Sequence, residues 1–392
     1  MHTPLPTIPQ AEYPKRWGAV RRFMQEKQLD LLLAYGDDRA VFGPAHIRWL
    51  ADVPVHFEPF CVLFTQDEQP VLLCGPESDE YARLRGHIPD VRVLRDFTHP
   101  DEDYPFTRIQ PLVEILAELG WKANDMRRVG IGGKALMNAE TLSAFMEALP
   151  DAQWLDVELD LCRLRAVKTA SELDVIRHTY HIAEIGLQAA IDAIRPRVPE
   201  RKVAAAIESA MRSAGAEGMG IDTIVASGPN KRPILARATF RPIEARDAVL
   251  LTIAPRYEGY HAAIGRLVFV GQPDAQIEHA YHTAVEAQQA CQAQLKPGVE
   301  GRKVEAVGRE NMTAAGYGDF FLYSGLHSLG VIEFEAPIFG PSSQELLKED
   351  MVISIDIPAF NAPWGGLRVE DGYRITPTGS EKLNQTEFFF YQ

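Results

Sequence analysis

Two acidic side chains stand on segments that are otherwise apolar. Asp356 ends the run Val352-Ile-Ser-Ile, and Glu370 follows Leu367-Arg-Val. A carboxylate that is buried without a partner is costly, so each of these groups needs a cation, a proton or a basic side chain. Two carboxylates that lie close together also raise the pKa of one of them, which makes an acid available for catalysis.

Three kinds of partner fit this pair of carboxylates. The first is a substrate that carries an amidine, guanidinium or ammonium group. The second is a single divalent metal ion. The third is an internal ion pair with Arg368 or Arg266, which would be structural rather than functional. The residues themselves leave all three interpretations open.

The elements that must position these carboxylates begin near residue 165. Apolar side chains recur at helical spacing from Ile176 to Ile194, and Thr169 with Glu172 predicts an N-terminal capping box. Pro196 ends this helix, and a second helix is predicted up to Gly215.

The same pattern then returns further along the chain. Setting residues 196–215 against residues 297–316, an offset of 297 − 196 = 101, gives nine identical pairs in 20 positions. Asp247-Ala-Val with Pro255 resembles Asp350-Met-Val with Pro358 at nearly the same offset. We therefore expect a duplicated helix-helix-strand unit, with a functional site between its two halves.

The first 165 residues have the pattern of a separate α/β unit. Its predicted elements are two helices, 16–28 and 108–119, and five strands, 31–35, 60–64, 71–73, 128–131 and 153–156.

Composition excludes several classes of function. The 392 residues include 54 acidic and 40 basic side chains, a net charge of −14, which argues against nucleic acid or an anionic membrane as the main partner. No apolar run approaches the roughly 18 residues of a membrane helix, and the N-terminus lacks the features of a signal peptide. Four widely spaced cysteines indicate neither a zinc site nor a disulfide framework. We expect a cytoplasmic protein.

The order of these elements and motifs resembles the pita-bread superfamily of creatinase, prolidase, aminopeptidase P and methionine aminopeptidase. The segments that carry the resemblance are 164–173, 227–230, 247–251, 259–266, 327–330, 335–337, 351–356 and 366–371. The resemblance implies an α/β creatinase-type N-terminal domain, residues 1–165. It also implies an α+β pita-bread C-terminal domain, residues 166–392, with internal pseudo-two-fold symmetry.

The resemblance also implies where metal ligands would stand. Metallopeptidases of the superfamily hold two divalent ions with two aspartates, a histidine and two glutamates, and these positions fall on Thr252, Ala263, His327, Asp356 and Glu370. Alanine cannot bind a metal, and threonine replaces a bridging carboxylate poorly. We therefore expect no resident cofactor, with a single divalent ion on His327, Asp356 and Glu370 as the alternative.

Creatinase provides a metal-free precedent within the resemblance, since it also lacks the aspartate pair. Its general-base histidine, however, corresponds to Leu235, and the superfamily's second site histidine corresponds to Phe334. We expect His327 to act in proton transfer, with His261 as its partner. His261 is two residues from Ala263, so on one continuous strand the two would share a face.

The predicted substrate-binding residues are Asp356, Glu370, Arg368, Thr252 and Phe334. The leading hypothesis is a creatinase-like hydrolase that cleaves a carbon–nitrogen bond in a small amidine- or amide-containing metabolite. The alternatives are a divergent single-metal aminopeptidase or dipeptidase of the Xaa-Pro type, and a non-catalytic binding protein on the same fold. The resemblance further implies a homodimer. Asp222 and Glu333 are interpreted as structural or solvated side chains.

Overall fold

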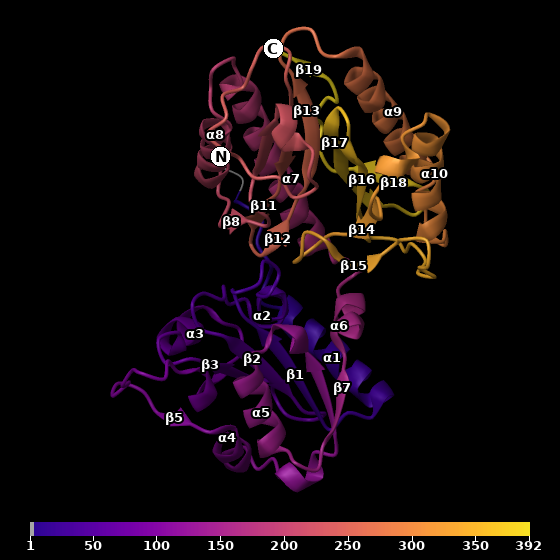
Figure 1. Cartoon of the computed structure of the whole chain (residues 1–392). Helices are drawn as coiled ribbons and strands as arrows, with labels where there is room; N and C mark the ends of the chain where they lie inside the picture. Colours follow the sequence, from indigo (N-terminus) through magenta and orange to yellow (C-terminus); the bar gives the residue numbers. More distant parts are fainter. Residues whose placement is uncertain (1–3) are drawn as a thin grey trace. The chain divides into compact units, whose positions relative to one another are not determined.

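The computed structural model describes residues 4–392 of the chain. Its internal contacts divide it into two compact units, which Figure 1 colours along the sequence. One unit is Pro9–Leu164. The other is Arg165–Gln392 together with residues 4–8.

The N-terminal unit is built on a seven-stranded mixed sheet in the order β5-β4-β3-β2-β1-β6-β7. Its strands are β1 Leu31–Gly36, β2 Phe60–Phe64, β3 Val71–Cys74, β4 Asp90–Leu94, β5 Ile109–Gln110, β6 Arg128–Gly132 and β7 Gln153–Asp156. Its helices are α1 Glu12–Lys27, α2 Ala45–Ala51, α3 Asp79–Arg85, α4 Leu112–Glu118, α5 Ala139–Ala148 and α6 Glu158–Leu164.

The central strand β1 is apolar along its length because both of its faces are covered. Leu31, Leu33 and Tyr35 share a core cluster with residues of α4 and α5, while α2 packs against the same strand. The predicted strands are confirmed to within a residue. The predicted helix over 108–119 is wrong at its start: residues 109–110 form β5, and Pro111, which has an extended backbone, precedes α4.

The C-terminal unit carries the duplicated pattern. Its helices are α7 Ala170–Ala193, α8 Glu200–Ser213, α9 Ala275–Gln292 and α10 Gly301–Ala314. Its strands are β8 Gly218–Met219, β9 Ile224–Ser227, β10 Ala248–Ile253, β11 Pro255–Tyr257, β12 Tyr260–His261, β13 Ile264–Phe269, β14 Leu326–Ser328, β15 Glu335–Ile338, β16 Val352–Ala362, β17 Gly365–Ile375, β18 Ser380–Lys382 and β19 Phe390–Tyr391.

The large sheet of this unit shows the internal symmetry directly. Its order is β15-β14-β16-β17-β13-β10-β9, so β14-β16-β17 on one side mirrors β9-β10-β13 on the other. Helices α8 and α10 have 14 residues each and begin 301 − 200 = 101 positions apart. Helices α7 and α8 pack together, as do α9 and α10, and contacts of α7 and α9 attach the two pairs to the sheet (Figure 1). The predicted duplication and fold class are confirmed.

Local signals read from the sequence act as expected at the start of this unit. The Thr169 side chain accepts a hydrogen bond from the Glu172 backbone, and the Glu172 carboxylate accepts one from Thr169 N–H, which completes the capping box of α7. None of the helices in residues 4–392 has both the length and the apolar character that crossing a membrane requires.

Candidate metal centre

Paired strands bring the predicted site residues into one row across the large sheet. Asp356 on β16 lies opposite Glu370 on β17, and Glu370 lies opposite Gly265 on β13. Gly265 in turn lies opposite Thr252 on β10. Residues 326–328 of β14 continue the sheet beyond β16, which places His327 near the end of this row.

The ring of His327 is held in one orientation by its neighbour. Its Nδ1 lies 2.9 Å from the carbonyl oxygen of Ser328, which can only accept a hydrogen bond. Nδ1 therefore carries a proton, and Nε2 faces the site, 3.8 Å from Glu370 Oε1. One ring nitrogen fixed by a backbone acceptor and the other directed into the site is the arrangement that metal-binding histidines use.

Glu370 is buried with one of its two oxygens engaged by a second side chain. Ser354 donates a hydrogen bond of 2.8 Å to Oε1, whereas Oε2 has no hydrogen-bond partner among residues 4–392. Burial alone would raise the pKa of Glu370, but the hydrogen bond with His327 and the charge of Arg368 hold that pKa below its usual value. The site therefore contains a buried carboxylate oxygen that is ionised and available.

Glu333 is the third member of this group, although its place in the sequence indicates a structural or solvated side chain. It lies in the segment between β14 and β15 and is buried. One ligand atom from each of His327, Glu333 and Glu370 lies within 4.8 Å of the others. Burial, and then the charge of Glu370, raises the pKa of Glu333 to about 7. The interpretation of Glu333 as a structural or solvated residue misses this, because a glutamate in an irregular segment carries no periodicity that reveals its burial.

Asp356 has a different partner from Glu370. Its Oδ1 lies 3.2 Å from Nε of Arg368, and its Oδ2 accepts a 2.7 Å hydrogen bond from Tyr323. The third interpretation of the sequence, an internal ion pair with Arg368, therefore describes Asp356. Burial raises the pKa of Asp356 to about 6, with the charge of Arg368 opposing this rise. Glu333, rather than Asp356, joins His327 and Glu370 as a possible ligand.

The remaining arginine candidate serves another carboxylate. Arg266 is fully buried and pairs with Asp371 at 2.6 Å, and its contact with Glu370 is to the main-chain oxygen, at 2.9 Å. Thr252 accepts a 3.1 Å hydrogen bond from Arg368 Nη1. Phe334 packs its ring against His327, with centroids 4.3 Å apart, so it forms a wall of the histidine's surroundings.

His261 lies close to the Glu333 segment, but not in the way that the sequence pattern predicts. The strand is interrupted at residues 262–263, and His261 belongs to β12 of a separate three-stranded sheet. The argument that His261 and Ala263 share a strand face is therefore wrong, since alternation requires an unbroken strand. His261 instead uses its backbone N–H, at 2.8 Å, and its Nδ1, at 3.2 Å, to hold the carbonyl of Gly330.

The chemistry available to His261 follows from its burial. Burial, helped by the charge of Arg256, lowers the pKa of His261 to about 3, and its Nε2 has no hydrogen-bond partner among the described residues. It is thus a neutral ring that anchors the segment leading to Glu333. Its role as proton-transfer partner of His327 stays a prediction. Leu235, at the position of the lost histidine, is 70% exposed.

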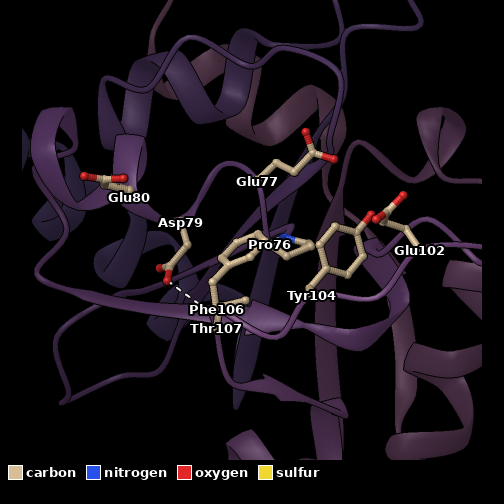
Figure 2. Close-up of a pocket in the computed structure, with 8 residues that line it drawn as sticks. All are labelled: Pro76, Glu77, Asp79, Glu80, Glu102, Tyr104, Phe106 and Thr107. Carbon is tan, nitrogen blue, oxygen red and sulfur yellow. Dashed lines mark hydrogen bonds between the residues drawn. The ribbon is translucent and has the colours of Figure 1, made fainter.

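The N-terminal unit has a cavity of about 720 Å³ that none of the predicted site residues lines. Carboxylates of Glu77, Asp79, Glu80 and Glu102 surround it, with Tyr104 and Phe106 (Figure 2). Asp79 accepts a 3.1 Å hydrogen bond from Thr107 there. The chemistry that the sequence indicates is therefore confined to the C-terminal unit.

Comparison with known proteins identifies the family. The sequence profile of Metallopeptidase family M24 matches residues 174–377, which includes the whole site, and that of the Creatinase/Prolidase N-terminal domain matches residues 16–167. The chain belongs to metallopeptidase family M24. It is thereby a member of the creatinase, prolidase and aminopeptidase P superfamily, as its motifs indicate.

Individual relatives named as peptidases agree with this assignment. The Xaa-Pro dipeptidase of Pyrococcus furiosus is 34% identical over 224 residues, which is 57% of this chain and 64% of that protein. The chain thus spans just under two thirds of this relative's length. The uncharacterized peptidase YqhT of Bacillus subtilis is 31% identical over 250 residues, 64% of this chain and 71% of that protein.

Solved structures share the fold of this M24 protein over nearly its whole length. The prolidase from Pyrococcus horikoshii OT3 covers 95% of this chain and 99% of its own, with a TM-score of 0.82 at 24% identity. The prolidase from Pyrococcus furiosus covers 94% and 99%, with a TM-score of 0.77 at 26% identity.

Family membership and geometry together correct one expectation. The predicted absence of a cofactor is wrong, because the chain belongs to a family of metallopeptidases and gathers His327, Glu333 and Glu370 as a possible ligand group. One imidazole and two carboxylates are a donor set suited to a divalent transition metal. The buried Oε2 of Glu370 has no hydrogen-bond partner among the described residues, so a cation bound by this set would satisfy it. The residues present therefore fit one ion.

Proposed function

We propose that this protein is a peptidase of the Xaa-Pro dipeptidase type that works with one divalent metal ion held by His327, Glu333 and Glu370. The observation that carries the proposal is the convergence of these three buried side chains, with ligand atoms within 4.8 Å, inside the segment that matches family M24. Relatives named as Xaa-Pro dipeptidases support a dipeptide substrate over the small amidine of the leading sequence hypothesis.

A divalent ion at such a site supplies Lewis-acid polarisation of a carbonyl and a hydroxide at neutral pH. The protein's own groups prepare the position. Ser328 O fixes the His327 ring so that Nε2 faces the site, and Ser354 holds Glu370 Oε1, the oxygen that lies 3.8 Å from Nε2. Phe334 packs against the ring of His327, which is buried.

Arg368, Thr252 and Asp356 have a supporting part in this proposal. Arg368 forms an ion pair with Asp356 and donates a hydrogen bond to Thr252, so the polar groups of these residues are already engaged with one another. We therefore propose that they set the shape and charge of the pocket and do not contact the substrate directly. The homodimer, the cytoplasmic location and the domain boundary at residue 165 remain predictions that the proposed function does not require.

Metal content and substrate choice test the proposal together. The purified protein is dialysed against a chelator, reconstituted with Mn²⁺, Co²⁺ or Zn²⁺, and analysed by mass spectrometry for bound metal. Each form is then offered Xaa-Pro dipeptides, the same dipeptides with alanine in place of proline, and small amidines. We expect one bound ion and metal-dependent hydrolysis that is confined to the Xaa-Pro set.

Variants of the ligand group sharpen the test. His327→Ala, Glu333→Gln and Glu370→Gln should each weaken metal binding by at least about 100-fold, since even supporting residues of metal sites contribute roughly 10–100-fold. His279→Ala is the matched control, because His279 on α9 contacts Tyr317 at 2.7 Å and is not part of the ligand group. Full turnover by the metal-free protein would refute the proposal. Turnover of amidines alone would favour the creatinase-like hydrolase, and ligand binding without any turnover would favour a binding protein.

A further inference from the structure

The side chain of Arg368 passes over Gly265, a position of the large sheet that has no side chain. Arg368 lies two residues before Glu370 on β17, so the two side chains leave the same face of the strand. Between β17 and β10 stands Gly265 on β13. A Cβ atom added at Gly265 would lie 2.6 Å from Cγ of Arg368, which is closer than real Cβ contacts come. The bare glycine therefore leaves the room that the arginine stem occupies.

The guanidinium group of Arg368 contacts three polar side chains, one of which, Asp356, lies opposite the proposed ligand Glu370. Its Nη1 donates to Thr252 Oγ1 at 3.1 Å, and its Nη2 donates to Tyr323 Oη at 2.7 Å. Its Nε lies 3.2 Å from Asp356 Oδ1. Tyr323 closes the ring by donating to Asp356 Oδ2 at 2.7 Å. Arg368 is only 7% exposed, so this charge is fixed inside the protein.

A count of buried charges shows what this cation does. Glu333, Asp356 and Glu370 together carry three negative charges when ionised, and all three are buried. Arg368 neutralises one of them through its pair with Asp356. The two charges that are left, on Glu333 and Glu370, match one divalent cation and not two.

We propose that Arg368 is a built-in cation that occupies the place of a second metal ion, so that the centre binds a single divalent ion. Arg368 acts as a positioning residue: it engages Asp356 and Thr252 and thereby removes both from metal binding. The inference rests on the proposed function, since the single ion is the one assigned to His327, Glu333 and Glu370. It adds a reason, built into this chain, why the metal count stays at one.

The test places a carboxylate where the guanidinium now makes its hydrogen bond to Thr252. In Thr252→Asp alone, the new carboxylate pairs with Arg368, so the count should stay at one. In the double variant T252D/R368Q, the carboxylates of Asp356 and of the new residue are both released, and we expect a second bound ion. Each protein is saturated with Mn²⁺, passed through gel filtration and analysed by mass spectrometry, with circular dichroism to establish folding.

Arg374→Gln is the matched control. Arg374 lies on β17, as Arg368 does, but outside the site, where it pairs with Asp350 at 2.8 Å. This variant should bind one ion, as the wild type does. Two ions in the wild type or in T252D would overturn the inference, and this readout stands even if the double variant does not fold. A folded double variant that still binds one ion would also overturn it.

Failure of the proposed function would look different. If the wild type binds no ion, the proposed metal enzyme is refuted. The role of Arg368 is then judged by the difference in bound ions between T252D/R368Q and the wild type. A gain of one ion in T252D/R368Q over the wild type supports Arg368 as the built-in cation, and no gain refutes it.

Discussion

Asp356 and Arg368 form a buried ion pair within the row of site residues, with Oδ1 of the aspartate 3.2 Å from Nε of the arginine. Asp356 is 3% exposed, so neither charge can turn to water if the other is removed. The pair therefore links the stability of the fold to the charge of the site.

Breaking this pair from one side should destabilise the protein strongly. Asp356→Asn leaves the Arg368 charge buried without its counter-charge, which costs about 3–5 kcal/mol in comparable pairs. The double variant D356N/R368M removes both charges, so it should be less destabilised than the sum of the single variants. Urea unfolding measures the free energies. As a control, Glu381→Gln at the partly exposed pair with Arg177 should cost no more than about 1 kcal/mol. Additive single-variant effects would contradict the pairing.

The hydroxyl of Ser354 should contribute to metal affinity. It donates a 2.8 Å hydrogen bond to Glu370 Oε1 and so orients a proposed ligand. Ser354→Ala should weaken metal binding about 10-fold or more while leaving the count at one. Ser328→Ala is a close control, because the buried Ser328 Oγ has no hydrogen-bond partner within residues 4–392. Calorimetric titration with Mn²⁺ measures both, and equal affinities for the two variants would contradict the role of Ser354.

Acid should destabilise the fold through His261. Its pKa is about 3 in the folded protein, against 6.5 as the ordinary value, because it is buried and faces Arg256. The unfolded chain therefore takes up the proton first. The stability of the neutral form is complete above pH 6.5 and falls by up to about 1.4 kcal/mol per pH unit between pH 6.5 and 3. Arg256 also pairs with Glu217 at 2.9 Å.

The variant that isolates this effect is His261→Asn, whose amide can still donate to Gly330 O. Its free energy of unfolding should depend less on pH than that of the wild type, with the difference growing as pH falls below 6.5. His56→Asn replaces an exposed histidine of the N-terminal unit and should leave the slope unchanged. Parallel pH profiles for the wild type and His261→Asn would rule out His261 as the source.

Gly372 should tolerate no side chain while Tyr180 is present. A Cβ atom at Gly372 would lie 1.9 Å from Oη of Tyr180 on α7. Gly372→Ala should therefore cost about 1–3 kcal/mol through overpacking. Tyr180→Phe removes the nearest clashing atom but keeps Cζ, which lies 2.2 Å from the added Cβ, so the double variant should recover only a small part of this loss. Gly379→Ala, which meets its nearest atom at 4.0 Å, should be close to neutral in the same thermal unfolding assay. A Gly372→Ala protein of wild-type stability would contradict this prediction, because it would mean that α7 shifts and moves Tyr180 away at little cost.

The sequence by itself determined the architecture and part of the site. The duplicated segments, the capping box of α7 and the strands that carry Asp356 and Glu370 depend on local patterns, and local patterns are written along the chain. His327, Asp356 and Glu370 were likewise recognisable from their motifs. The strand break at residues 262–263 and β5 before Pro111 were not, because pairing with distant strands decides where such short segments end.

Only the tertiary structure decided which charges meet. Glu333 sits in an irregular segment, and its proximity to His327 and Glu370 depends on how that segment folds over the sheet. Arg368 pairs with Asp356, and Arg266 pairs with Asp371. Which arginine pairs with which aspartate depends on strand register and on the space above Gly265. Charge pairing acts through space over a few ångströms, so residues that are far apart in sequence become partners only once the fold has placed them.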